Sequence, residues 1–312
     1  MSNVEETLAW EAQWRPRAAA AAVVGALCGT AGSILLLVLE NDGPREEDGF
    51  VSLPESLRGL EGGQLPPDDA SLRVRQADYT ADNVEMVLLG TVLSVLGVVG
   101  ALLALSYVFR ATRARFPEVG RVVGWSVAGA LALYPLGRLG RGIGEAIETS
   151  QFADAAERTA GAARELTTSG IIPGAYLLEI LGTFALALAF VLVSMNAMRV
   201  GLFTRFMGIL GVIVGALVVF GLDAALIVRG IWLVMLGMLI AGRYPGGNVP
   251  PAWATGRAEP WPTQQELRER RAALRAEHAP VPEPPAAGEE REPEQEGDYL
   301  PGAARRKRKK RR

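Results

Sequence analysis

The chain has 312 residues, of which 49% are hydrophobic and 21% charged, and its formal net charge is −2. It contains one cysteine, Cys28, and one histidine, His278. This inventory excludes an internal disulfide, a Cys/His nucleophile pair and a cluster of histidine or cysteine metal ligands. We therefore expect a non-enzymatic protein with no catalytic residues, no metal site and no cofactor.

Long apolar segments predict an all-α integral membrane protein. A helix crosses a hydrocarbon core of about 30 Å with about 20 apolar residues. The first segment is too long for the apolar core of a signal peptide, so we expect it to be retained. The last two segments are separated only by Asp223 and are together too long for one crossing, which predicts a turn there. The six predicted spans are at about residues 18–39, 84–109, 122–137, 171–196, 207–222 and 224–241.

The third predicted span, 122–137, is the shortest, and it contains Pro135. It crosses only if the arginines that follow it extend to the interface and the bilayer thins locally. If it does not cross, the rest of the chain changes side. Residues 138–170 carry charges of both signs, and two interpretations stay open: a surface helix or helix pair near the headgroups, or a solvated connector.

The placement of basic residues predicts the orientation. The short loops 110–121 and 197–205 are rich in arginine, which is typical of cytoplasmic loops. We therefore expect a bacterial plasma-membrane protein with both termini in the cytoplasm. The cytoplasmic parts are then 1–17 and 242–312, and the outer loops are 40–83 and 138–170.

The two largest polar regions differ in composition. The loop 40–83 is acidic, with a short run at 53–60 that could form a helical turn or two; we expect a solvated loop rather than a cation site. The tail 242–312 is rich in Pro, Glu and Arg and is expected to be disordered. Within it, a capping box from Thr263 to Glu266 opens a predicted short helix at about 264–278.

Small residues at helical spacing suggest where helices pack. In lipid, such residues let two helix backbones approach closely. The candidate packing residues are Gly25 and Gly29 in the first span and Gly211 and Gly215 in the fifth. The alternative is that glycines in so glycine-rich a chain face lipid without a packing role.

Two ionisable residues lie inside predicted spans. Glu179 is in the fourth span and Arg229 is in the sixth. Charged residues in spans tend to face the bundle interior and pair with one another. One hypothesis is an ion pair between Glu179 and Arg229 in the outer third of the bundle; the other is that Arg229 reaches the outer headgroups and Glu179 is neutral or hydrated.

The chain ends in eight consecutive basic residues. They are Arg305, Arg306, Lys307, Arg308, Lys309, Lys310, Arg311 and Arg312. Each base near an anionic leaflet contributes about 1 kcal/mol of binding, so we expect contact with anionic lipid headgroups. Contact with the acidic stretch 289–298 is a second possibility, and nucleic acid is a less favoured partner.

Parts of the chain resemble a known family. The run from Met195 to Gly211, with Arg199, Gly201 and Arg205, is similar to a segment of uncharacterised multi-pass membrane proteins of actinobacteria. The same is true of 107–115 and of 242–262 with Trp253 and Trp261. The resemblance covers much of 80–265 and implies a membrane protein without an assigned activity. The tryptophans beside prolines suggest a segment lying against the cytoplasmic headgroups.

Two functions remain open at this point. One is a non-enzymatic scaffold or envelope accessory protein that lies in the lipid bilayer and binds an unidentified protein partner. The other is a small transporter or channel that uses Glu179 and Arg229. Few polar residues are available to line a path and no inverted repeat is evident, so the first is favoured.

Overall fold

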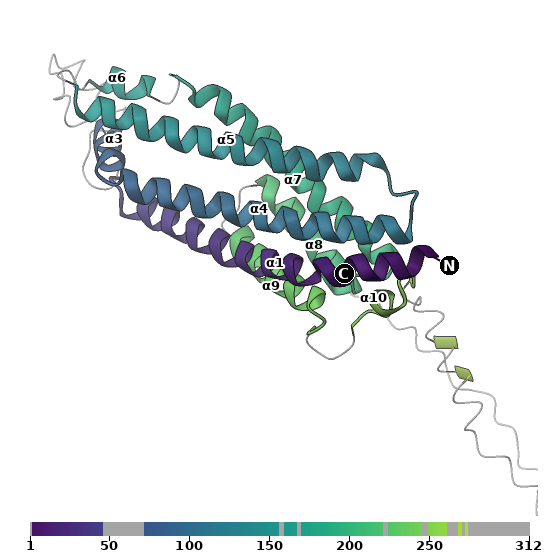
Figure 1. Cartoon of the computed structure of the whole chain (residues 1–312). Coiled ribbons are helices and arrows are strands. Elements are labelled where there is room, and N and C mark those ends of the chain that lie inside the picture. Colours follow the sequence, from purple (N-terminus) through teal and green to yellow (C-terminus); the bar gives the residue numbers. More distant parts are fainter. Residues whose placement is uncertain are drawn as a thin grey trace, which may run out of the picture. The chain divides into compact units, whose positions relative to one another are not determined.

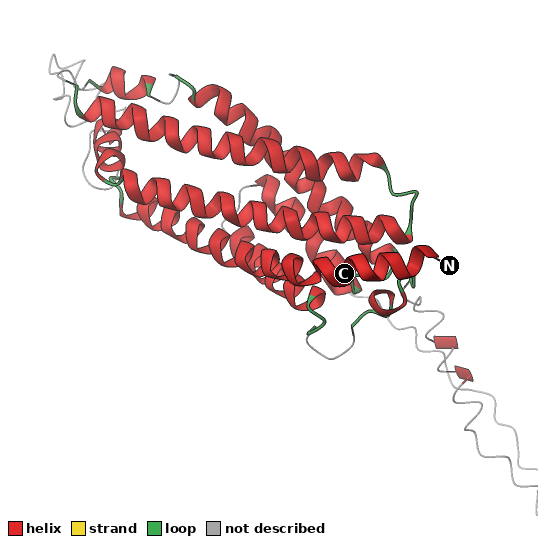
Figure 2. Cartoon of the chain, viewed as in Figure 1, coloured by secondary structure: helices red, strands yellow, loops and turns green. Residues whose placement is uncertain are grey.

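The computed structural model describes residues 2–45, 72–155, 159–166, 170–220, 224–244 and 249–260, together with 268–269 and 272–273. Over these residues every regular element is a helix and there is no strand (Figure 2). The chain divides into two units, Met1–Trp261 and Pro262–Arg312. In the second unit the four described residues are helical and fall within the predicted helix 264–278. The rest of that prediction, the run 53–60, the acidic stretch 289–298 and the basic end 305–312 lie outside the described residues.

Four helices of the first unit are long and apolar enough to cross a membrane. They are α1 (Ser2–Asp42), α4 (Val84–Arg115), α5 (Arg121–Ala153) and α7 (Ile172–Arg199). Two further apolar helices, α8 (Arg205–Phe220) and α9 (Ala224–Ile240), have 16 and 17 residues. At about 1.5 Å per residue these two are roughly 24–26 Å long, a little shorter than a hydrocarbon core of about 30 Å.

The six apolar helices form a ring in chain order. Each packs against the next one along the chain, and α9 closes the ring against α1 (Figure 1). We call the end where α1 begins and α4 and α9 finish the cap end, because the short helix α10 (Ala252–Thr255) lies there. We call the opposite end the α3 end, after α3 (Leu72–Asp82), which packs against α5 and α6 (Ala160–Glu165).

Glycines set the spacing of α1 and α4. A Cβ built on Gly32 would lie 2.6 Å from the Ser94 nitrogen, and one built on Gly100 would lie 2.7 Å from the Gly25 Cα. A Cβ on Gly97 would overlap the Cα of Gly29. These distances leave no room for side chains, so the two backbones are in direct contact along this seam. The predicted pair Gly25 and Gly29 therefore faces α4 rather than lipid.

Close backbone contact at glycines also joins other helices of the ring. On α8, a Cβ on Gly215 would lie 2.8 Å from the Ala187 carbonyl oxygen of α7, and one on Gly211 would overlap the Ser194 hydroxyl. Between α5 and α7, a Cβ on Gly137 would overlap the backbone of Glu179. The second predicted pair, Gly211 and Gly215, thus faces α7. The contact between α5 and α7 at Gly137 was not predicted from glycine spacing.

Helix boundaries differ from the prediction in three places. The span expected at 122–137 does not end there, because α5 continues through Pro135 to Ala153. The first half of 138–170 is therefore helical and not an irregular connector, and it is continuous with the predicted span. The helix persists because α7 packs along α5 on both sides of Pro135. Residues 1–17 are likewise not a separate segment, because α1 begins at Ser2 and runs through Pro16. Finally, the loop 40–83 contains α3, which buries Val74 and Ala77.

Candidate functional site: charged side chains within the bundle

Glu179 lies at the centre of a group of charged side chains between α5 and α7. Its carboxylate is 2.9 Å from Arg141 Nε and 3.5 Å from Arg138 Nη1. Arg141 Nε is also 3.8 Å from a carboxylate oxygen of Glu145, one turn further along α5. We call these four residues the Glu179 cluster. Its two arginines and two glutamates balance in charge, which lowers the cost of placing them within an apolar bundle.

The contact between Arg141 and Glu179 is an ion pair without a well-aligned hydrogen bond. Arg141 Nε and Glu179 Oε2 are close, but the N–H does not point at the oxygen and neither atom has a hydrogen-bond partner among the described residues. The side chains of Glu179 and Arg138 are 15% and 16% exposed, so water has limited access. The Arg141 guanidinium also lies over the ring of Tyr176, 6.0 Å from its centroid. The cluster therefore holds charge in place without bringing together a nucleophile and a base.

Arg229 lies elsewhere. Among the described residues the ion pairs of Glu179 are with Arg138 and Arg141, so the predicted Glu179–Arg229 pair is not formed. A Cβ on Gly29 would be 3.7 Å from Arg229 Nη2, which places the guanidinium against α1.

The position of Arg229 along α1 follows from its contact with Gly29, which is near the middle of the apolar run 18–39. Because α8 and α9 are short and α9 ends at the cap end, Arg229 lies only part of the way along α1. The predicted depth of Arg229 in a membrane stays a prediction.

A cavity of about 450 Å³ opens at the α3 end beside the Glu179 cluster. Polar side chains from two helices line it: Arg73, Gln76 and Thr80 of α3, and Glu145, Glu148 and Thr149 of α5. Glu145 belongs to both the cavity and the cluster. The cavity is not evident from the sequence, because 40–83 has the composition of a loop. The apolar residues Val74 and Ala77, three residues apart, are the sequence signal that indicates α3, and both are buried.

A second charged site, at the cap end, is structural. Arg115 forms an ion pair with Glu11, and their side chains are 0% and 2% exposed. Arg115 Nη2 also donates to the Ala252 carbonyl oxygen at 2.8 Å. The Tyr107 hydroxyl donates to the Glu11 carbonyl oxygen at 3.3 Å. These bonds join α1, α4 and α10.

The segment 252–260, which we call the cap, packs against this end. The expectation of disorder from residue 242 onward is therefore wrong for the cap, because buried contacts hold it to the bundle. Trp253 is 3% exposed and its Nε1 donates to the Leu202 carbonyl oxygen at 2.9 Å. The Glu259 amide donates to the Val200 carbonyl oxygen at 3.0 Å. Gly201 has φ of 77°, a conformation that favours glycine, and a side chain there would overlap Glu259. Trp253 is thus a buried anchor of the cap, and its ring does not point away from the protein. The predicted position of this segment against the cytoplasmic headgroups stays a prediction, and Trp261 lies outside the described residues.

Comparison with known proteins gives no relative for this arrangement: no family model, curated protein or solved structure matches the chain. Over the described residues no three or more His, Cys, Asp or Glu side chains form a group that could hold a metal ion. The Glu179 cluster with its cavity, and the closed cap end, are therefore the features on which a function must be argued.

Proposed function

We propose that the chain is a plasma-membrane protein with six spans and both ends in the cytoplasm, and that it acts as a non-enzymatic scaffold or envelope accessory protein. The ring order of the helices supports six spans, because each helix reverses direction relative to the one before it. The length of α9 fits this placement. Arg229 lies beside the middle of the apolar run of α1, and Ala224, five residues earlier in α9, lies about 8 Å nearer to the proposed outer end of that run. The resemblance to actinobacterial multi-pass proteins implies a membrane placement only, and it assigns no activity.

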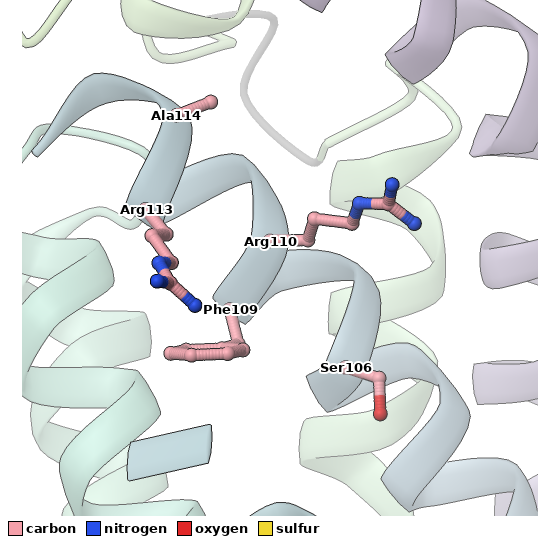
Figure 3. A pocket seen from close by; sticks show the side chains of 5 residues that line it. All are labelled: Ser106, Phe109, Arg110, Arg113 and Ala114. Atoms are coloured by element: carbon pink, nitrogen blue, oxygen red, sulfur yellow. The ribbon is translucent and has the colours of Figure 1, made fainter. Parts of the chain in front are cut away.

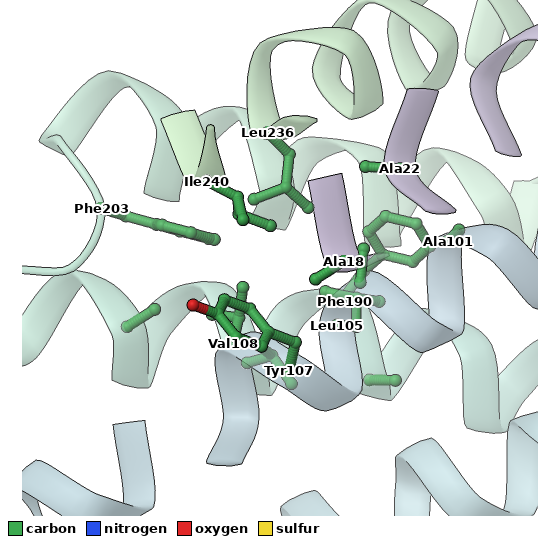
Figure 4. Packing of buried hydrophobic residues seen from close by; sticks show 14 of the residues in the cluster. Ala18, Ala22, Ala101, Leu105, Tyr107, Val108, Phe190, Phe203, Leu236 and Ile240 are labelled. Carbon is green, nitrogen blue, oxygen red and sulfur yellow. The ribbon is translucent and has the colours of Figure 1, made fainter. Parts of the chain in front are cut away.

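The packing of the cap half of the ring is the observation that carries the scaffold proposal. Large side chains with at most 1% exposure fill it, and Figure 4 shows part of this cluster. Trp232 lies in T-shaped contact with Phe190 at 5.3 Å and with Phe203 at 6.1 Å, and its Nε1 donates to the Met207 carbonyl oxygen. A conduction path requires water or polar atoms along its length. A close-packed apolar core supports a static bundle better than a transport path.

A transporter is the second candidate, and the Glu179 cluster is the observation that favours it. Ionisable side chains within a bundle are costly, and they often mark substrate or proton pathways. Here they adjoin a cavity that opens at the α3 end. A transporter would have to open the core around Trp232 and release the cap during each cycle.

Flux measurements separate the two candidates. The purified protein is reconstituted in liposomes that contain a pH-sensitive dye, and proton flux is followed after a pH step or a potassium diffusion potential. If the protein is a scaffold, liposomes with the natural protein or with Glu179→Gln should show the same proton flux as liposomes without protein. Flux that Glu179→Gln abolishes would refute the scaffold and support the transporter.

A partner test complements the flux measurement. A photo-crosslinking residue at Arg257, exposed on the cap, should capture one defined protein in intact cells. The matched control is Leu188, which is 50% exposed on the lipid-facing side of α7 and should capture lipid only. Identical products at both positions, or none at Arg257, would contradict a scaffold that acts through its cap.

A further inference from the structure

Two adjoining cavities lie beside α4 at the cap end. The first, of about 250 Å³, is lined by both α1 and α4 and includes Trp10, Trp14 and Arg17 on α1. The second, of about 430 Å³, is lined by α4 alone. Ser106 and Arg110 line both cavities. In Figure 3 Ser106 and Arg110 extend to one side of α4, and Phe109 and Arg113 extend to the other.

The arginines at these cavities differ from their neighbour Arg115. Arg115 is buried and paired with Glu11. Arg17, Arg110 and Arg113 are exposed and take part in no ion pair among the described residues. Arg110 instead lies over Trp10, 4.7 Å from the ring centroid, and Arg17 lies over Trp14 at 5.0 Å. A guanidinium that lies near an aromatic ring keeps N–H groups with which it can bind an anion.

The floor of the first cavity is apolar. Ala18 and Ala21 of α1 and Leu103 of α4 line it below the arginines. Deeper along the same two helices, Val24 and Leu96 are 53% and 49% exposed. We call the first cavity and its apolar continuation along α1 and α4 the α1–α4 groove. Its lining changes from basic and aromatic at the cap end to apolar towards the middle of the bundle. A free phosphate ion could bind only the basic part of the groove. A phospholipid matches both parts, because its headgroup is anionic and its acyl chains are apolar.

We propose that the α1–α4 groove is a binding site for an anionic phospholipid. The phosphodiester lies between Arg17 and Arg110, and an acyl chain follows Ala21 and Leu103. Trp10 and Trp14 hold the two guanidinium groups at headgroup depth, as aromatic residues do at membrane interfaces. The site rests on the membrane placement in the proposed function, but not on the choice between scaffold and transporter.

Native mass spectrometry of the full chain in neutral detergent tests the site. The probes are phosphatidylglycerol, phosphatidylcholine as the zwitterionic control, and inorganic phosphate as a competitor. We expect one phosphatidylglycerol to bind more tightly than phosphatidylcholine. Arg17→Ala and Arg110→Ala should each weaken its binding about five-fold, the effect of one interfacial base. The basic tail is present in every variant, so its contribution cancels.

Matched variants separate the groove from general basicity. Arg121→Ala removes an exposed arginine of the same end that lines neither cavity, and it should bind phosphatidylglycerol like the natural protein. Arg110→Lys should keep most of the affinity because it keeps the charge. Ala21→Phe fills the apolar floor and should weaken lipid binding without any change in charge. The melting temperature of each variant in detergent shows whether it is folded.

Three results would overturn the proposal. In the first, Arg17→Ala and Arg110→Ala bind phosphatidylglycerol as Arg121→Ala does. In the second, phosphatidylcholine binds equally well. In the third, millimolar inorganic phosphate displaces the lipid, which would mean a site for free phosphate. Failure of the membrane placement is detected separately, because the protein would then be released from membranes by alkaline carbonate.

Discussion

The buried ion pair between Arg115 and Glu11 allows a quantitative test of the cap end. Both side chains are almost fully buried, and Arg115 also donates to the Ala252 carbonyl oxygen. Removing one member of such a pair leaves an uncompensated buried charge, which costs about 3–5 kcal/mol. We therefore expect Arg115→Met to lower the free energy of unfolding by about 3–5 kcal/mol, and to loosen the cap as well.

A double-mutant cycle gives the coupling directly. Because an apolar replacement of both partners leaves no buried charge, Glu11→Leu combined with Arg115→Met should cost much less than the two single changes added together. The assay is unfolding by SDS in mixed micelles, followed by tryptophan fluorescence. Arg113→Ala is the control, since Arg113 is exposed on the same turn and unpaired; it should change stability by less than about 0.5 kcal/mol. Additive single effects would refute the idea that the pair acts as a unit.

Two further predictions concern the helix seams and the Glu179 cluster. Gly97→Ala forces α1 and α4 apart and should destabilise the protein by about 1–3 kcal/mol or more in the same assay, whereas Gly120→Ala meets no atom within 4 Å and should not. If the two substitutions have equal effects, close backbone contact is not what holds this seam. Glu179→Gln should be coupled to Arg141→Gln in a double-mutant cycle but additive with Arg229→Leu, because Glu179 pairs with Arg141. Strong coupling between Glu179→Gln and Arg229→Leu would instead indicate a Glu179–Arg229 ion pair and contradict the structure.

Apolar runs alone were enough to locate α1, α4 and α7, because a run of about 20 predominantly apolar residues has few alternatives to a helix in lipid. The same criterion placed the end of α5 too early. Pro135, Arg138 and Arg141 mark the end of a span when taken singly. In the structure α7 packs along α5 on both sides of the proline, and Glu179 offsets the arginines. Both compensations come from a helix that is distant in sequence.

Helix faces were harder to predict than helix positions. Glu179 and Arg229 are both ionisable residues in spans, but pairing depends on rotation and register, which the sequence pattern of α7 and α9 does not define. The sequence gives no sign that Trp253 is buried, because its acceptor, the Leu202 carbonyl oxygen, is 51 residues away along the chain. Glycine spacing was more informative, since Gly25 and Gly29 contact the α4 backbone, although the sequence alone left open that they face lipid.

The proposed topology requires that α8 and α9 cross the membrane, and cysteine labelling tests this directly. In a Cys28→Ser background, a single cysteine replaces Phe220, which is 72% exposed at the end of α8, and intact cells are treated with a membrane-impermeant thiol reagent. Six spans predict labelling of Phe220→Cys and of Glu40→Cys from outside, and protection of Arg243→Cys until the cells are opened. Labelling of Arg243→Cys in intact cells, or protection of Phe220→Cys, would contradict the proposed topology.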